Sequence, residues 1–304
     1  MLRVTVDIFS GRPNPSWVLD EAKARDALHQ ISLTRGAIGR EVEIPPLGYR
    51  GVTIETLTDQ LAADYGLPHR FHLANRSSDN EARGIELASK LVSEALGEIK
   101  GTRKKLLAAV PGTDEPGLGK FLIEQIEGRV LGSSPHMLVF EAGPPTAKPA
   151  ASPVTCAIET LPFQPAYWND PAHVTRNNCY AYATNMRTDT FPQPGKATGH
   201  QVPFPPDCKT TAAGAISDGA HEGNDCFPAD EAPRMVVAMV IWPKRDYHWY
   251  RLHTEGFWGH KPSGTPARNV DQSGNVITNP QTCNRGQYTE FCGYFLIPKS
   301  IKVQ

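Results

Sequence analysis

The sequence lacks any excess of charge of one sign and any long apolar run. Its 304 residues carry 31 basic and 32 acidic side chains, so no net electrostatic field favours nucleic acid or an anionic membrane as a partner. The longest apolar stretch, Met235 to Trp242, is far shorter than the ~20 residues that span a bilayer. These absences predict a protein that neither binds nucleic acid nor inserts into a membrane.

The first residues also lack the pattern of a leader sequence. No basic region followed by a sustained apolar core occurs there, so we expect no signal peptide. The resulting expectation is a cytoplasmic protein, and delivery by a secretion route that needs no signal peptide is the alternative.

Cysteine is scarce and unevenly placed. Six cysteines in 304 residues, all in the second half of the chain, are too few for a disulfide scaffold. Cys208 and Cys226 are predicted to lie in a loop rich in glycine, aspartate and proline, and they could pair in an oxidising environment. Together with His221 they form a weak zinc candidate, but no CxxC pair occurs. We therefore expect no metal and no cofactor.

Residues 1–140 predict a compact α+β module. Leu2, Val4, Val6 and Ile8 alternate with polar residues, the pattern of a half-buried strand. Two further strands are predicted over residues 49–57 and 69–74. Three helices are predicted over residues 20–31, 79–107 and 121–126. No phosphate-binding loop, catalytic carboxylate pair or nucleophile elbow occurs in this module, so a binding, targeting or oligomerisation role is the default.

Proline and glycine become frequent after residue 140. This composition predicts a proline-rich, semi-extended linker over 141–165 and a second domain over 166–304. Helix is expected to be scarce after residue 186. The apolar run Met235 to Trp242 predicts a strand buried on both faces, and the strand patterns that follow it cover 247–252, 256–260, 266–271 and 293–297.

The second domain contains a cysteine in a position that suits a nucleophile. Asn177 and Asn178 precede Cys179, and the Asn178 side chain is a plausible N-cap of a helix that Cys179 opens. The free N–H groups and macrodipole of a helix start favour a thiolate. A pKa lowered to about 7 would raise the thiolate population more than tenfold. The alternative is that Cys179 is a small, inert, buried residue.

A cysteine nucleophile needs a histidine as base and a third group that orients the histidine. His248 follows the buried strand and faces the opposite side of its own strand from His253. The turn at 254–256 returns His260 to about the level of His248 or Tyr250, within reach of a cross-strand or diagonal contact. The sequence therefore predicts a Cys-His-His arrangement, with Asn269 or Asp271 as alternative orienting residues.

The spacing of these residues resembles that of the papain-like NlpC family of peptidoglycan-cleaving cysteine hydrolases. Tyr167 precedes Cys179 by twelve residues, and His248 precedes His260 by twelve. The resemblance implies Cys179 as nucleophile, His248 as base and His260 as orienting residue. It also implies that the Tyr167 hydroxyl contacts the substrate or the oxyanion.

Two further features complete the predicted site. The backbone N–H of Cys179 would form the oxyanion hole, to which Asn178 or Tyr167 would contribute. Trp249 and Trp258 would line a substrate cleft, although each is as easily explained as part of a protein core.

The sequence thus predicts an α+β protein whose second domain is papain-like, with a cysteine-bearing helix packed on an antiparallel sheet or small barrel. The expected activity is hydrolysis of an amide bond through an acyl-enzyme, on a peptide, isopeptide or peptidoglycan-like substrate. Transfer of the acyl group to an amine or alcohol, as in a transglutaminase, is one alternative. A non-catalytic binding protein with an aromatic cleft and an inert Cys179 is another.

Overall fold

The computed structural model describes residues 1–40, 46–75, 77–101, 118–128 and 156–304. The chain forms two compact units, which consist of residues 1–8 with 13–141 and of residues 9–12 with 142–304. The second unit thus resumes where the predicted linker over 141–165 begins, and residues 141–155 of that linker lie outside the described part. The sequence did not predict that the short segment 9–12 belongs to the second unit.

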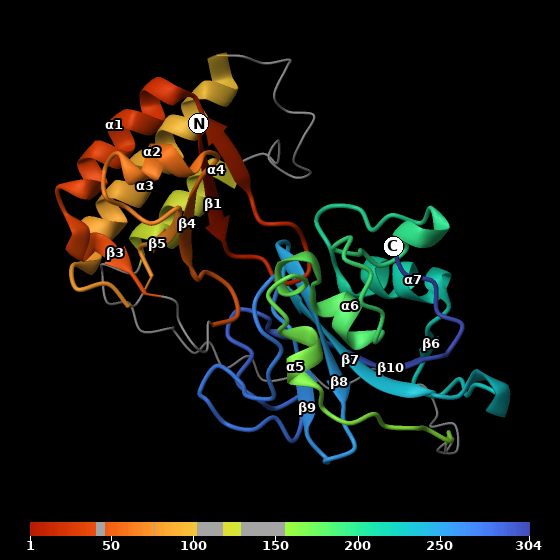
Figure 1. Ribbon diagram of the computed structural model, residues 1–304. Helices are drawn as coiled ribbons and strands as arrows, with labels where there is room; N and C mark the ends of the chain where they lie inside the picture. The colour runs from red at the N-terminus through yellow and green to blue at the C-terminus, as the bar shows by residue number, and fades with distance from the viewer. Residues whose placement is uncertain (41–45, 76, 102–117, 129–155) are drawn as a thin grey trace. The chain divides into compact units, whose positions relative to one another are not determined.

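The first unit is built on an antiparallel sheet of five strands (Figure 1). Alternation places Leu2, Val4 and Val6 on a fully buried face and leaves Arg3 exposed, as the period-2 pattern predicts. The strands, in the order β2-β1-β4-β5-β3 across the sheet, are β1 (Leu2–Asp7), β2 (Ser16–Leu19), β3 (Ile38–Gly39), β4 (Gly51–Thr56) and β5 (Arg70–Leu73).

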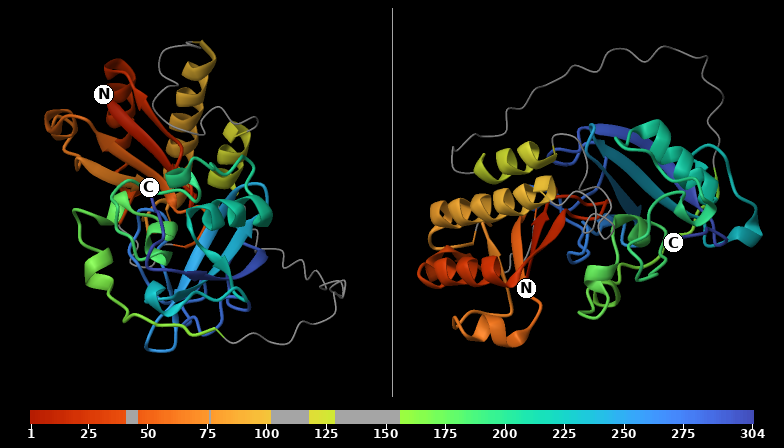
Figure 2. Two further views of the ribbon diagram at one scale, coloured as in Figure 1. Left: turned by 90° about the vertical axis from the view of Figure 1, so that its right-hand side faces the viewer. Right: turned by 90° about the horizontal axis from the view of Figure 1, so that it is seen from above.

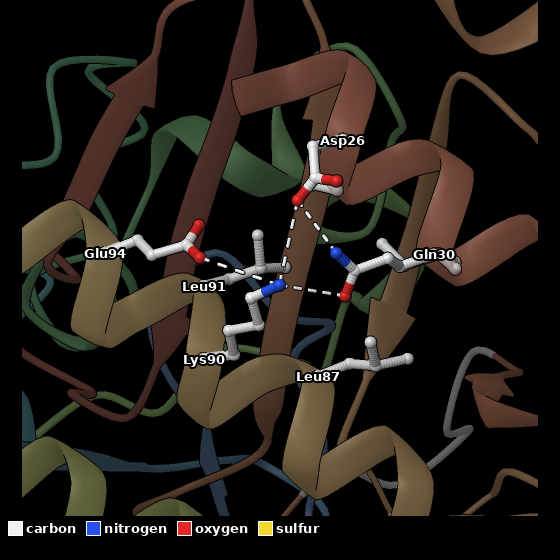
Figure 3. Close-up of a pocket in the computed structure, with 8 residues that line it drawn as sticks. Asp26, Gln30, Leu87, Lys90, Leu91 and Glu94 are labelled. Atoms are coloured by element: carbon white, nitrogen blue, oxygen red, sulfur yellow. Dashed lines mark hydrogen bonds and ion pairs between the residues drawn. The ribbon is translucent and has the colours of Figure 1, made fainter. Parts of the chain in front are cut away.

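Helices complete the first unit. Its described helices are α1 (Glu21–Ser32), α2 (Asp59–Ala63), α3 (Glu81–Gly101), α4 (Leu118–Glu127) and the short 3-10 turn η1 (Arg35–Ala37). Helices α1 and α3 lie side by side, and both polar and apolar side chains of the two helices line a small surface pocket (Figure 3). The helices predicted over 20–31 and 121–126 are confirmed, and the part of the helix over 79–107 beyond residue 101 lies outside the described residues.

The second unit also contains a five-stranded antiparallel sheet, with the order β6-β10-β7-β8-β9. Its strands are β6 (His221–Glu222), β7 (Met235–Trp242), β8 (Asp246–Leu252), β9 (Trp258–His260) and β10 (Glu290–Ile297). The predicted buried strand is β7, which has neighbours on both edges and is almost entirely buried. Residues 266–271 form isolated bridges rather than the predicted strand.

The second unit also contains short helices (Figure 2). They are α5 (Pro165–Trp168), α6 (Cys179–Ala183), α7 (Cys208–Asp218) and the 3-10 turns η2 (Val174–Arg176), η3 (Lys196–Thr198) and η4 (Ala229–Glu231). Helix α7 corrects the prediction that the region of Cys208 is a loop. A reciprocal capping box joins Asp207 and Thr210 at its start, and Gly219 ends it with a φ of 115°.

The structure confirms an α+β protein in both units. Among the residues that the structure describes, no helix combines the length and the apolar character that crossing a membrane requires. In the second unit, α6 packs directly against β8. Cys179, Tyr180 and Trp249 belong to the apolar cluster between these elements, whereas His248 takes the opposite face of β8 from Trp249 because side chains alternate along a strand.

Candidate active site

Cys179 is the first residue of α6, and every residue of this helix is buried. The Oδ1 atom of Asn178 accepts a hydrogen bond of 3.1 Å from the N–H of Ala181. This side chain satisfies one of the backbone donors that a helix start leaves without a partner. The predicted N-cap and the position of Cys179 at the helix start are therefore confirmed.

His248 and His260 lie on neighbouring strands and contact each other. The register pairs His260 of β9 with Tyr250 of β8, so His248 and His260 form a diagonal pair. The Nε2 atom of His248 lies 2.8 Å from the Nδ1 atom of His260. Both rings are buried, with exposures of 0% and 1%. The predicted diagonal contact is thus present.

A backbone carbonyl determines which ring nitrogens of the two histidines carry a hydrogen. The Nε2 atom of His260 lies 2.9 Å from the carbonyl oxygen of Val270. A carbonyl oxygen accepts only, so this Nε2 atom carries the hydrogen. Burial lowers the pKa of His260 well below its usual value, and its neutral ring therefore accepts at Nδ1. His248 therefore donates from Nε2 to His260.

The sulfur of Cys179 lies beside β8, where the backbone N–H of Trp249 donates to it. Trp249 directly follows His248 in the strand. Burial raises the pKa of the Cys179 thiol well above its usual value, and the charge of Asp246 adds to this rise. The expectation of a lowered pKa was wrong, because the helix start is fully desolvated.

A buried lysine holds the backbone that leads into α6. The Nζ atom of Lys261 donates to the carbonyl oxygens of Val174 at 2.5 Å, Asn177 at 2.6 Å and Ser263 at 3.0 Å. These acceptors match the three hydrogens of an ammonium group. Burial lowers the pKa of Lys261 to about 7, and the Cys179 thiolate would act against this effect. Its charge is thus coupled to that of the candidate nucleophile.

The two predicted oxyanion contributors have other environments. The Nδ2 atom of Asn178 donates to the carbonyl oxygens of Gly11 and Pro192, at 2.8 Å and 2.7 Å. The Tyr167 ring is 44% exposed and contacts the Arg187 guanidinium. The fully buried Cys179 does not share this surface environment, so the structure does not bring Tyr167 to the site.

The two tryptophans predicted to line an aromatic cleft are buried instead. Trp249 is fully buried, with its ring 5.7 Å from Tyr180 and 5.5 Å from Phe295. Trp258 is 7% exposed, and its ring centroid lies 5.6 Å from that of Tyr294. Because both tryptophans are buried, they are part of the core, where an indole stabilises the fold by packing.

The alternative orienting residues also serve other purposes. The carboxylate of Asp271 accepts from the N–H groups of Ser273, Asn275 and Asn284 at 2.8 to 3.0 Å, and thereby closes a turn. Asn269 bonds through its backbone to Ile277. His260 occupies the place beside His248 that these residues were proposed to take.

Sequence reasoning missed Asp246, Lys261 and the segment Phe9–Arg12. The Asp246 carboxylate is fully buried and accepts from the N–H groups of Ser10, Gly11 and Arg12. A charged residue at the start of a strand that carries a candidate base is the one signal that pointed to Asp246. No sequence signal links residues that are separated by more than 230 positions.

The cysteines pair differently from the prediction. Disulfides join Cys156 to Cys226 and Cys208 to Cys292, and Cys179 and Cys283 are free. The proposed Cys208–Cys226 pair is therefore wrong, and the two cysteines of the zinc candidate are already bonded. No group of three or more potential metal ligands occurs among the described residues.

The fold and the site define an α+β protein in which a cysteine-bearing helix packs on an antiparallel sheet with a pair of hydrogen-bonded histidines. Comparison with known proteins finds no matching family model and no matching solved structure. A curated relative is insoluble matrix shell protein 1 of Ruditapes philippinarum, which is 42% identical over 134 residues, or 43% of this chain and 86% of that protein. The chain belongs to the family of this matrix shell protein.

This relationship corrects the predicted location. A cytoplasmic protein was expected, but the family includes an insoluble matrix shell protein and the second unit contains two disulfides. Disulfides persist in oxidising environments outside the cytosol and are rare within it. The prediction of a cytoplasmic protein is therefore wrong.

Proposed function

We propose that the second unit is an extracellular cysteine-dependent hydrolase that cleaves an amide bond in a peptide. Cys179 is the nucleophile, His248 the general base and His260 the residue that orients the base. The observation that carries this proposal is the donation from His248 to His260 and from His260 to Val270. His248 lies on β8, the strand against which the Cys179 helix α6 packs directly.

The chemistry follows from these positions. The Cys179 thiol transfers its proton to Nδ1 of His248, and the sulfur attacks the carbonyl carbon of the peptide. Backbone N–H groups at the start of α6 stabilise the resulting oxyanion. The imidazolium of His248 then donates its proton to the leaving amine as the C–N bond breaks. Water, activated by the same histidine, releases the acid from the acyl-enzyme.

Two observations support an extracellular peptide as the substrate. The chain belongs to the family of a protein named for the insoluble shell matrix, and its disulfides suit an oxidising environment. The spacing resemblance to NlpC-type hydrolases adds a precedent for peptide bonds in an extracellular polymer.

The free cysteines provide a matched test. Cys179→Ala should lower hydrolysis of a fluorogenic peptide library by at least about a thousandfold, while Cys283→Ala should retain the wild-type rate. When the reaction is stopped before the acyl-enzyme is hydrolysed, mass spectrometry of the protein should find the acyl group on Cys179. A wild-type protein that cleaves no member of the library and forms no acyl adduct would contradict the proposal. Products that carry an added amine in place of water would instead identify acyl transfer.

A second candidate is a non-catalytic component of an extracellular matrix. The full burial of Cys179, the raised pKa of its thiol and the family relationship favour it. It predicts that Cys179→Ala incorporates into an insoluble protein matrix as well as the wild type does. Sedimentation of the labelled proteins with matrix material measures this incorporation.

A further inference from the structure

We infer that the second unit contains a peptide-binding slot selective for glycine, and that the segment Phe9–Arg12 of the chain itself occupies it in this structure. The part of this inference that makes such a peptide the substrate rests on the proposed function. The segment belongs to the second unit, although the residues that bind it lie between 178 and 288 in the sequence.

One buried carboxylate binds the backbone of the segment. Asp246 accepts hydrogen bonds from the N–H groups of Ser10 at 2.5 Å, Gly11 at 3.1 Å and Arg12 at 3.1 Å. The Tyr288 hydroxyl donates to the same carboxylate at 2.6 Å. Successive N–H groups around one anion are a recurrent mode of anion binding by a peptide backbone, so any peptide able to adopt this conformation presents the same three donors.

The carbonyl oxygens of the segment are bound as well. The oxygen of Gly11 accepts from Nδ2 of Asn178 at 2.8 Å and Nε2 of Gln193 at 3.0 Å. The Tyr247 hydroxyl lies 3.1 Å from the same oxygen and donates its one hydrogen to Oε1 of Gln193 at 2.7 Å. The oxygen of Ser10 accepts from the N–H of Ser263 at 2.9 Å. The Gly11 carbonyl thus receives two side-chain donors from elsewhere in the unit, so its burial leaves no acceptor unsatisfied.

These donors adjoin the candidate catalytic pair. Asn178 immediately precedes Cys179, and Tyr247 immediately precedes His248. Asn178 thus binds the Gly11 carbonyl directly beside the proposed nucleophile. The Tyr247 ring, which limits the slot at Gly11, belongs to the strand that carries the proposed base.

The slot has room for glycine alone at its centre. A Cβ atom on Gly11 would lie 2.3 Å from Cε2 of Tyr247 and 2.6 Å from the carbonyl oxygen of Tyr247. Both distances are far below van der Waals contact, and the oxygen belongs to the backbone of β8, which cannot move aside locally. The slot therefore excludes every larger residue at this position.

The next position of the peptide is recognised by its positive charge. The guanidinium carbon of Arg12 lies 4.4 Å from the centroid of Phe9 and 4.5 Å from that of Phe204. Its Nη1 atom donates to the carbonyl oxygen of Arg245 at 2.9 Å. Cation–π contacts and a carbonyl acceptor favour arginine, so the preferred ligand is a peptide with glycine followed by arginine, bent as residues 10–12 are here.

The segment is tethered at both ends, which gives it an effective concentration on the order of millimolar at the slot. A free peptide therefore does not displace it from the wild-type chain. The variant Gly11→Ala should release the segment through the contact with Tyr247, and the emptied slot should then accept a peptide supplied in solution. Gly36→Ala is the matched control, since the nearest atom to its added Cβ is 3.8 Å away.

The test uses the full chain and two labelled peptides, acetyl-Phe-Ser-Gly-Arg-amide and the same peptide with alanine in place of glycine. Fluorescence anisotropy should show binding of the glycine peptide to Gly11→Ala and no binding to the wild type or Gly36→Ala. The alanine peptide should bind at least about tenfold more weakly. Iodoacetamide labelling of Cys179 should accelerate about ten- to a hundredfold in Gly11→Ala and slow again when the glycine peptide saturates the protein.

Equal binding of both peptides to Gly11→Ala, or binding of neither to the folded variant, would overturn the inference. If Gly11→Ala does not fold, Arg12→Ala replaces it, because this change removes the cation–π contacts without adding an atom. Glycine-selective binding without any Cys179-dependent cleavage would overturn the proposed hydrolase and leave the slot established. Cleavage of peptides without preference for glycine would overturn the slot and leave the hydrolase established.

Discussion

The two units of the chain bury polar groups to very different degrees. In the first unit, ion pairs lie on the surface, as between Arg3 and Glu55 or between Arg25 and Glu21. In the second unit, charged side chains such as Asp246 and Lys261 are completely buried and bonded to backbone groups. The regular helices and strands of the first unit satisfy their own backbone, whereas the irregular segments of the second unit need side chains for this purpose.

This difference indicates which of the two units provides a suitable environment for reactive groups. The cluster around Lys90 in the first unit is formed by Asp26, Gln30 and Glu94 on the surfaces of α1 and α3 (Figure 3). Solvated ion pairs of this kind contribute little to stability and hold no group in a fixed environment. The buried groups of the second unit are desolvated and held rigidly, the conditions under which proton affinities shift and reactive groups are positioned.

The largest effect should come from the buried carboxylate. Asp246→Ala leaves the four donors of Ser10, Gly11, Arg12 and Tyr288 without their acceptor. We expect the second unit to lose about 4 kcal/mol of stability or more, measured by hydrogen exchange resolved along the chain. The exposed acid Asp225 is the control, because Asp225→Ala should change stability by less than about 0.5 kcal/mol. Equal effects of the two changes would remove the contrast between buried and surface charge.

Loss of a disulfide should affect one unit and spare the other. All six cysteines lie beyond residue 155, and the Cys208–Cys292 bond closes a loop with a sequence separation of 84. The double change Cys208→Ser with Cys292→Ser should destabilise the second unit by about 3 kcal/mol. Urea unfolding followed by Trp17 in the first unit should keep its midpoint. A shift of that midpoint would show that the units do not unfold independently.

Acid should also act selectively on the second unit. Burial, followed by the charge of Arg251, lowers the pKa of His253 to about 4. The unfolded chain, with a pKa near 6.5, therefore binds more protons as the pH falls from 6.5 towards 4. The second unit should lose up to about 3 kcal/mol across this window and no further stability from this group below it. His253→Gln should flatten the dependence, and an unchanged pH profile in this variant would show that another group causes it.

The smallest effect should come from the surface cluster of the first unit. Lys90 is 45% exposed and lies 3.7 Å from Asp26 and 3.8 Å from Glu94. Lys90→Met should change the stability of the first unit by less than about 1 kcal/mol, because solvent screens these pairs. Thermal unfolding at low and high salt measures this difference. A loss of several kcal/mol would mean that the cluster is structural after all.

Local pattern was enough to predict much of the second unit. The apolar run of β7, the N-cap at Asn178 and the helix that Cys179 opens are encoded within a few neighbouring residues. The diagonal contact of His248 and His260 follows from the length of one hairpin. Helix α7 was missed, although its capping box at Asp207 and Thr210 and the glycine at its end are equally local signals.

What the sequence by itself determined is therefore which elements form and which residues share a face of a strand. The tertiary structure decided the disulfide pairs, the burial of Cys179 and the capture of Phe9–Arg12 by Asp246. Each of these depends on groups that are distant in the chain and become neighbours on folding. Desolvation is a property of the packed environment and not of the local sequence, and for this reason the thiol expected to have a lowered pKa has a raised one.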